Sequence, residues 1–451
     1  MDQKLQVLLD TVKKLIRRGA YPNLNKVIGK SHPADIAELF SYLSPKEQQI
    51  LFSLIEDTET AASVLSELDY STGAHLLEQI GHETITKVLQ EMAYDDAAEI
   101  IRNMPEDVAQ EILSTMQDEH SDEIEQLLQY DEDTAGGIMS TEIFSLREDT
   151  TAQQAIEALQ MARDVEMVFY VYVTDARNHL MGVLSLRQLL TVPPSTRLKD
   201  IMTTEVFSVR TDTDQEEVAH LVAKYNILAI PVVDQWKKLV GIITVDDVID
   251  VLREEATEDI YKMAGTSEEE LMYGFKSMKV AQLRLPWLIT NLFGGIITGY
   301  LMWRFQATLK EVIALISFIP VITGMGGNVG GQSSTIVVRG FATGHIDFST
   351  LRQVFFKELR VGVIMGGVCG LTVGLVAIVW HHNPYLGLVV GLAMMSAMTV
   401  AAVMGVLAPS FFKRVGVDPA IASSPFVQTA NDITGILIYF GTATLFLQHL
   451  R

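Results

Sequence analysis

Beyond Arg284 the chain consists of five long apolar segments, and this feature constrains the possible fold more than any other. The segments are Leu285–Trp303, Val312–Val338, Val361–Trp380, Tyr385–Pro409 and approximately Ile421–Leu447. A helix of about 20 apolar residues is long enough to cross a bilayer. Because lipid offers no partners for backbone polar groups, such segments are expected to be helical. The sequence therefore predicts a transmembrane domain of five helices over residues 280–451.

The basic residues that flank these segments predict an orientation. The start of the chain, Met1–Leu5, lacks the basic and apolar regions of a secretory signal, so residues before 284 are expected in the cytosol. The inner flanks then carry Lys276, Lys279, Arg284, Arg339, Arg352, Lys357, Arg360, Lys413 and Arg414, and the outer flanks carry Arg304, Lys310 and Arg451. This excess follows the positive-inside rule. We expect a multi-pass protein of a bacterial-type plasma membrane, with its N-terminus in the cytosol and its C-terminus outside.

One carboxylate, Asp432, lies in the middle of the last apolar segment. An ionised side chain at that depth costs several kcal/mol unless it faces water, a cation or a partner, so intramembrane acids are candidate functional residues. No basic residue lies within reach along the segment. We therefore expect the partner of Asp432 to be a cation that passes through the membrane.

The second apolar segment contains a glycine-rich stretch, Pro320–Ser334, with two amide side chains one helical turn apart, Asn328 and Gln332. The glycines alone are explained by close packing between helices. The amides are not, because Asn and Gln at membrane depth need polar surroundings. They are a second candidate for a polar path.

The soluble part of the chain, before residue 284, is strongly acidic, and the whole chain has a formal net charge of −22. This charge argues against nucleic acid as a partner. It is explained either by solubility or by a domain that binds cations. The single cysteine, Cys369, lies within the third apolar segment, which excludes a disulfide framework and a thiolate metal site.

Residues 1–130 have the apolar spacing of helices throughout. A loose unit with acidic residues in its first turn recurs at Pro33, Asp95 and Pro105, and each copy is typical of a helix start. Short helices repeated in this way predict a small superhelical stack.

The next region, residues 131–252, is duplicated. Ile138–Thr150 matches Ile201–Thr213, and Met181–Leu190 matches Val240–Ile249 at a similar separation. Each copy predicts the order strand, helix, strand, turn, strand, helix. The pattern resembles a tandem pair of cystathionine-β-synthase (CBS) domains, which pack together as one regulatory module.

CBS pairs often bind adenine nucleotides through a Thr or Ser followed three residues later by Asp. The second copy has this pattern in Thr244 and Asp247, whereas the first has Ser185 and Gln188. The resemblance therefore makes ATP a possible ligand, although only the second of the two copies carries the expected pattern. Helix capping explains the same residues without a ligand.

An acidic helix is predicted to connect the second CBS copy to the first membrane span, within residues 246–275. In a helix its acids fall at successive i,i+4 positions, where like charges are destabilising. They are Asp246, Asp247, Asp250, Glu254, Glu255, Glu258 and Asp259. A divalent cation that joins them to acids elsewhere would remove the repulsion, and hard oxygen ligands suit Mg²⁺ or Ca²⁺. The alternative is a solvated helix face.

Three motifs, taken with the domain order, resemble the MgtE family of magnesium channels and transporters over essentially the whole chain. They are Pro320 followed by Gly-Gly-Asn328-x-Gly-x-Gln332, Asp418-Pro-Ala followed by Pro425 and Asn431-Asp432-x-Thr-Gly435, and the acidic run Asp247–Tyr261. The resemblance implies a multi-domain membrane protein. Its parts would be an all-α superhelical N-terminal domain, an α/β tandem CBS pair and an α-helical domain of five spans.

The resemblance also implies a function. The protein would be a homodimer in a lipid bilayer with a Mg²⁺ pore on its two-fold axis, lined by the second and fifth spans. Asp432 from each subunit would hold a hydrated Mg²⁺, and Asn328, Gln332 and backbone carbonyls near Ala430 would shape the site. Mg²⁺ in the cytosol would close the pore by binding acids of the soluble domains and of the connecting helix, which acts as a plug. The acids concerned are Asp95 or Asp96, Glu216, Asp247, Asp250, Glu255, Glu258 and Asp259.

Three other functions compete with this one. An intramembrane metalloprotease needs a His-Glu-x-x-His motif, and the nearest string, His82–Thr86, lacks the second His. His381 and His382 lie in a short outer loop without a partnering acid. A membrane-bound nucleotide sensor would leave Asp432 unexplained. A transporter of Co²⁺, Zn²⁺ or Ca²⁺ with the same fold stays open, since selectivity depends on fine geometry.

Overall fold

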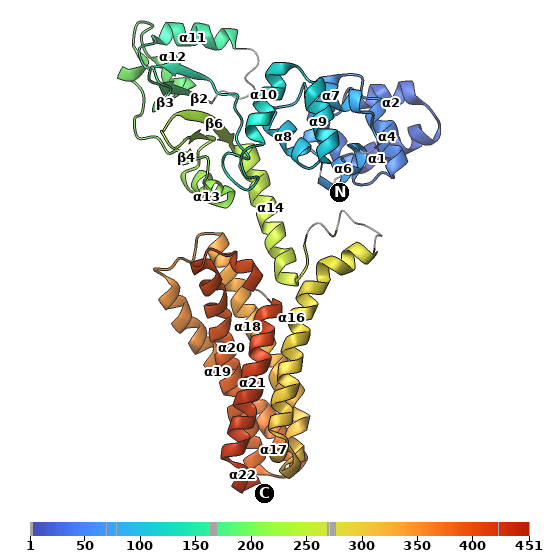
Figure 1. Cartoon of the computed structure of the whole chain (residues 1–451), viewed down its shortest axis with the longest axis vertical. Helices are drawn as coiled ribbons and strands as arrows, with labels where there is room; N and C mark the ends of the chain where they lie inside the picture. The colour runs from blue at the N-terminus through green and yellow to red at the C-terminus, as the bar shows by residue number, and fades with distance from the viewer. Residues whose placement is uncertain are drawn as a thin grey trace. The chain divides into compact units, whose positions relative to one another are not determined.

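The computed structural model describes residues 3–450 except residues 69, 78, 163–168, 268, 269, 271–276 and 423. The chain divides into two compact units, Met1–Leu252 and Arg253–Arg451. Each unit is described by itself (Figure 1).

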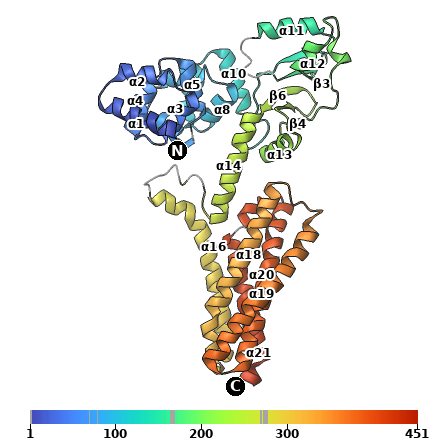
Figure 2. The same ribbon diagram turned by 180° about the vertical axis from the view of Figure 1, so that it is seen from behind.

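The first part of unit 1 is entirely helical. Its helices are α1 (Gln3–Arg17), α2 (Tyr21–Ile28), α3 (Pro33–Phe40), α4 (Pro45–Ser53), α5 (Thr58–Ser66), α6 (Tyr70–Leu77), α7 (His82–Leu89), α8 (Tyr94–Arg102), α9 (Glu106–Thr115) and α10 (Asp118–Leu127). The predicted helix starts at Pro33, Asp95 and Pro105 correspond to α3, α8 and α9. Alternate helices pack on each other, α3 on α5, α5 on α7 and α7 on α9. This arrangement confirms the predicted superhelical stack (Figure 2).

Two small sheets follow, one from each sequence repeat, and each combines a parallel with an antiparallel strand pair. The first repeat contains β1 (Ser145–Arg147), α11 (Ala152–Met161), β2 (Tyr170–Thr174), β3 (Leu180–Ser185) and α12 (Leu186–Thr191). The second contains a short 3₁₀ helix η1 (Leu198–Asp200), β4 (Val209–Arg210), α13 (Gln215–Tyr225), β5 (Ala229–Val233) and β6 (Leu239–Thr244). The predicted order of strands and helices is confirmed in both repeats.

The two repeats complete each other. Ser140, which precedes the first sheet, bridges Ile242 of β6, and its N–H donates to the Ile242 carbonyl at 2.8 Å. Thr203, which precedes the second sheet, bridges Val183 of β3 in the same way, at 3.0 Å. Each sheet therefore borrows an edge segment from the other repeat, which explains why the sequence contains two copies.

The hydrophobic cores of unit 1 do not follow the repeats. Leu89 of the helical stack and Ile230 of β5 belong to one continuous core. Val171 and Leu184 of the first repeat belong to a separate, smaller core. The second repeat is thus built into the helical stack more extensively than the first.

Helix α14 (Val245–Ala264) continues directly from β6 and crosses the division between the units. Gly265 follows it with φ of +77°, a left-handed conformation that glycine adopts readily and that ends a helix. The predicted connecting segment extended to residue 275, and its last part falls largely outside the described residues.

The rest of unit 2 is a bundle of long helices (Figure 1). Its elements are α16 (Ser277–Arg304), α17 (Gln306–Glu311), η2 (Ile313–Phe318), α18 (Ile319–Ala342), α19 (Leu351–His381), α20 (Pro384–Arg414), η3 (Pro419–Ala422), α21 (Ser424–Leu445) and α22 (Leu447–Leu450).

Four stretches of the described chain are long and apolar enough to cross a membrane. They are Ser277–Arg304, Ile313–Ala342, Leu351–His381 and Pro384–Arg414. Helix α21 has 22 residues and packs against α16, α18 and α20, but polar residues such as Asn431 and Asp432 lower its hydropathy. The fifth span therefore stays a prediction that rests on length and packing.

Glycines bring the helices of this bundle unusually close together. A Cβ built on Gly366 or Gly374 of α19 would lie 2.7 Å from the carbonyl oxygen of Met395 or Gly387 of α20. Only glycine permits this separation, in agreement with the small-residue packing typical of membrane helices. Tyr439 of α21 is fully buried, and its hydroxyl donates to the Leu315 carbonyl at 2.9 Å.

Candidate functional site

Helix α18 has one face packed inside the bundle and one face that the chain leaves open. Gly326 and Gly330 are buried, and Asn431 Nδ2 of α21 donates to the Gly326 carbonyl at 3.3 Å. Asn328 and Gln332 lie on the exposed side of the same helix. These two amides are therefore available to water, an ion or another chain.

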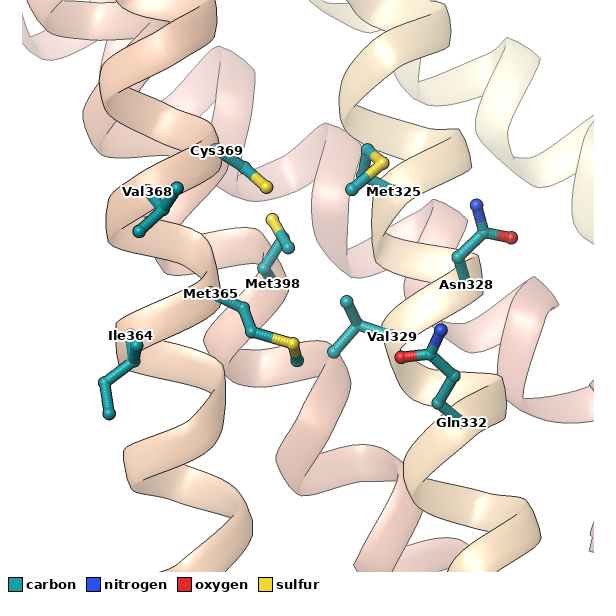
Figure 3. Close-up of a pocket in the computed structure, with 9 residues that line it drawn as sticks. All are labelled: Met325, Asn328, Val329, Gln332, Ile364, Met365, Val368, Cys369 and Met398. Carbon is teal, nitrogen blue, oxygen red and sulfur yellow. The ribbon is translucent and has the colours of Figure 1, made fainter.

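A cavity of about 540 Å³ adjoins this face between α18, α19 and α20 (Figure 3). It is lined by Met325, Asn328, Val329, Gln332, Ile364, Met365, Val368, Cys369 and Met398. In Figure 3, Met365 and Cys369 extend from α19 toward α18. The lining is sulfur-rich and apolar except for the two amides, so the cavity itself does not offer the oxygen ligands that Mg²⁺ prefers. Asp432 is not among these lining residues.

Asp432 lies on α21 and is partly exposed. Within the described part of the chain it forms no hydrogen bond or ion pair. Two residues earlier, the carbonyl of Ala430 accepts the Thr434 hydroxyl at 2.9 Å, so this oxygen is already a hydrogen-bond acceptor within the helix. Unit 2 thus presents, on α21, a carboxylate whose partner is not supplied by the described residues.

In unit 1 the predicted regulatory acids Asp95 and Asp247 lie close to each other. Burial, together with the negative charge of Asp95, raises the pKa of Asp247 to about 7. Two hydrogen bonds from Thr244 oppose this shift, one from its hydroxyl at 2.7 Å and one from its N–H at 3.2 Å. The arrangement holds two carboxylates together at a cost that a divalent cation would remove.

A second acidic contact in unit 1 involves a residue that the sequence analysis missed, Glu99 of α8. Burial, together with the charges of Glu132 and Asp250, raises the pKa of Glu99, and Arg102 opposes the shift. Glu99 follows Asp95 by four residues and therefore lies on the same face of α8. That spacing was the signal available in the sequence.

The other predicted acids near this contact lie in the first turns of α13 and α8. Glu216 lies in the first turn of α13, where Asp214 accepts its N–H at 2.9 Å, and its carboxylate is 3.7 Å from His220 Nε2. Asp96 lies beside Asp95 in the first turn of α8. No group of three or more His, Cys, Asp or Glu side chains suited to a metal occurs among the described residues. Mg²⁺ keeps several of its waters and is commonly held by one or two carboxylates, so pairs remain relevant.

The predicted nucleotide residues Thr244 and Asp247 are engaged at the start of α14. The first repeat has the same local structure, in which the Ser185 hydroxyl and N–H both donate to Gln188 Oε1 at 2.9 Å. Both pairs therefore act as helix caps, and capping by itself requires no ligand.

In unit 2 the end of α14 contacts the segment that joins α20 to η3 in the helix bundle. Lys262 Nζ lies 2.6 Å from Glu258 Oε1 and 2.7 Å from Asp418 Oδ2. Burial and the charge of Asp418 raise the pKa of Asp259 to about 6, while Arg339 lowers it. Among the predicted acids of α14, Glu258 and Asp259 thus belong to a contact with the bundle, and Glu255 lies one turn before Asp259.

Three family models match the chain in consecutive order. The intracellular N domain of MgtE matches residues 31–133, the CBS domain matches residues 135–195 and 198–254, and the MgtE divalent cation transporter matches residues 319–442. Magnesium transporter MgtE of Thermus thermophilus is 42% identical over 327 residues, which is 72% of each chain. The chain belongs to the MgtE family.

Further relatives agree with this assignment. Magnesium transporter MgtE of Enterococcus faecalis is 42% identical over 326 residues, again 72% of each chain. A crystal structure described as the cytosolic domain of the Mg²⁺ channel MgtE in complex with ATP covers 54% of this chain and 99% of its own, with 36% identity and a TM-score of 0.52. A structure of the soluble part of a magnesium transporter covers 56% of this chain and 99% of its own, with 30% identity and a TM-score of 0.51.

Proposed function

We propose that this MgtE family member transports Mg²⁺ across the plasma membrane, with its N-terminus in the cytosol and its C-terminus outside. The observation that carries the proposal is Asp432, an intramembrane carboxylate that has no ionic partner among the described residues. A transported divalent cation supplies that partner. The named relatives are transporters, and we propose transport rather than catalysis as the activity of this chain.

The pore is proposed to form between two copies of the chain. The exposed face of α18 with Asn328 and Gln332, and the partly exposed Asp432 on α21, offer polar groups that a second copy and a hydrated ion would cover. Two Asp432 carboxylates across a two-fold axis would repel each other without a divalent ion between them. Mg²⁺ gives up its first-shell waters reluctantly, so amides, the Ala430 carbonyl and paired carboxylates would recognise the hydrated ion.

The gate is proposed to use the acids of the soluble unit and of α14. When cytosolic Mg²⁺ is abundant, it would bind carboxylates such as Asp95, Asp247 and Asp250 and keep α14 in the position that closes the pore. When Mg²⁺ falls, repulsion between these carboxylates would release α14. The raised pKa of Asp247 supports this, since burial and the negative charge of Asp95 both make its ionised form costly in the absence of a cation.

ATP is proposed as a second ligand of the CBS pair. The support is the ATP complex of the related cytosolic domain and the Thr244–Asp247 pattern of the second repeat. In this chain the first repeat has Gln188 in place of an acid, so we expect the second repeat to provide the main nucleotide contacts.

The decisive experiment measures Mg²⁺ uptake into vesicles that contain the purified protein, with Asp432→Ala beside the wild type and Co²⁺, Zn²⁺ and Ca²⁺ offered in turn. We expect Mg²⁺ uptake by the wild type and none by the variant, while both elute as the same oligomer. Normal uptake by the variant would contradict a pore centred on Asp432. Preferred uptake of another ion would replace Mg²⁺ as the substrate.

A further inference from the structure

Glu358, near the start of α19, is a buried carboxylate that no part of the proposed transport mechanism uses. Its side chain is only 4% exposed. Among the described residues it is the one charged residue in the buried set; the other buried polar residues are neutral. Removing a carboxylate from water costs several kcal/mol unless it is paired and hydrogen-bonded. A carboxylate kept at such a position is expected to have a specific task.

The contacts of Glu358 connect two helices. Ser333 of α18 donates its hydroxyl to Glu358 Oε2 at 2.8 Å, and this hydrogen bond is buried. The other oxygen, Oε1, lies 3.2 Å from Nζ of Lys357, whose side chain is 60% exposed. Oε2 therefore connects α19 to α18, while the negative charge at Oε1 is balanced by the exposed ammonium group of Lys357.

On the side of α20, the contacts of α18 allow close approach but give little direction; on the side of α21, Asn431 Nδ2 donates to the backbone carbonyl of Gly326 at 3.3 Å, a long hydrogen bond that holds no side chain of α18. Gly330 lies against Gly405 of α20, and a Cβ on Gly405 would also lie 2.8 Å from Cβ of Ser333. Glycine surfaces are smooth, so they tolerate rotation of one helix against another. A buried polar contact has one good geometry and is a better device for setting orientation.

Ser333 directly follows Gln332, and successive residues of an α-helix differ in direction by about 100°. Fixing Ser333 toward α19 therefore also fixes the direction of Gln332 and of Asn328 one turn earlier. We infer that the Glu358–Ser333 hydrogen bond is a positioning device that sets the rotation of α18 and thereby the amide face offered to the cation. This inference rests on the proposed function, because it needs α18 to line the pore.

The inference predicts changed selectivity rather than simple loss of transport. In reconstituted vesicles, Ser333→Ala and Glu358→Ala should each raise the ratio of Co²⁺ to Mg²⁺ uptake about threefold, the effect of losing one average interhelical hydrogen bond in a membrane protein. The double variant should match the single variants, because both remove the same contact. Glu358→Gln should stay near the wild type, because its amide oxygen can still accept the Ser333 hydroxyl. Thr372→Ala is the matched control and should also leave the ratio unchanged, because this exposed hydroxyl of α19 donates only within its own helix, to the Val368 carbonyl at 2.9 Å.

A labelling experiment tests rotation directly. In a Cys369→Ser background, which removes the single native cysteine, Asn328→Cys should react with a charged, membrane-impermeant thiol reagent. Adding Ser333→Ala should lower that reactivity, whereas adding Thr372→Ala should not. Because labelling reads orientation, it also covers the case in which Glu358→Ala fails to fold.

The outcomes distinguish failure of the positioning role from failure of the proposed pore. If Asp432→Ala is inactive but Ser333→Ala and Glu358→Ala keep the wild-type uptake ratio and labelling, the positioning role is wrong and the pore stands. If the effects of the two substitutions multiply in the double variant, they act separately and the inference is equally overturned. If Asp432→Ala transports normally, the proposed pore itself fails.

Discussion

The two candidate carboxylate sites of this protein differ in whether a single chain supplies the groups that surround the carboxylate. In unit 1, Asp247 lies close to Asp95 and is capped by Thr244, and burial and mutual repulsion raise its pKa to about 7. In unit 2, Asp432 has no ion pair or hydrogen bond among the described residues. Around Asp247, a bound cation would relieve the repulsion between the carboxylates, as expected of a cation sensor. At Asp432, the charge has to be neutralised by a group from outside the chain, as expected of an ion pore.

The largest expected effect is the loss of Mg²⁺ transport when the charge of Asp432 is removed. Asp432→Asn keeps the size of the side chain but removes the charge, so Mg²⁺ uptake into vesicles should fall to the level of protein-free vesicles. Stabilisation of the soluble unit by Mg²⁺, measured as protection of its amides from hydrogen exchange, should be unchanged. Loss of both properties would show that the two sites are not separate.

A smaller effect is expected when the sensor side is removed. Neutralising Asp247, Asp250 and Glu255 together should leave Mg²⁺ transport intact but raise the cytosolic Mg²⁺ concentration that inhibits it, by about tenfold, a typical coupling between distant sites. Inhibition curves from inside-out vesicles measure this shift. Glu157→Gln, on an exposed face of α11, is the control. Unchanged inhibition in the triple variant would reduce these acids to a solvated surface.

Adding Mg²⁺ should stabilise the soluble site that contains Asp247. Mg²⁺ at a hundredfold excess over its dissociation constant stabilises a binding-competent fold by about 2.7 kcal/mol. We expect slower hydrogen exchange in α8 and α14 when Mg²⁺ is added to the full-length protein, and a clearly smaller change in Asp247→Asn. Equal protection in both proteins would exclude Asp247 as a ligand.

The smallest expected effect is on pH dependence. A carboxyl group whose pKa is raised on folding stabilises the fold when protonated, and this contribution is lost as the pH rises through the raised value. Without Mg²⁺, the contact between α8 and α14 should therefore weaken between pH 4 and about 7, the pKa of Asp247. Hydrogen exchange at these helices, corrected for its intrinsic pH dependence, measures the change. The slope should be shallower in Asp247→Asn, and an identical slope would place the titration elsewhere.

Much of the architecture could be predicted because it is encoded in local patterns. Apolar length located the membrane helices, and helical spacing located α3, α8 and α9. The sequence duplication predicted two β-sheets of equal design, although not that each sheet borrows a segment from the other. Domain boundaries and the individual ion-binding residues stay predictions.

The sequence pattern could not show which of the many acidic residues become buried next to each other. Glu99 joined Asp250 and Glu132 although nothing but its spacing from Asp95 marked it, and Glu358 looked like one charge among the basic residues of an inner flank. Thr244 and Asp247, singled out as a nucleotide pattern, also form the helix cap that the sequence allowed, and their role in nucleotide binding stays a prediction. Burial and pairing depend on how helices are rotated against each other, and that rotation is not a local property.

The sequence by itself determined that this chain enters a membrane, carries a duplicated module and has a carboxylate within its last apolar segment, because length, repetition and charge can be read without a fold. Only the tertiary structure decided that Asp95 raises the pKa of Asp247, that Lys262 contacts Asp418 and that Ser333 holds Glu358. Each of these contacts joins residues from different helices. Their energies depend on the distance and burial that packing alone creates.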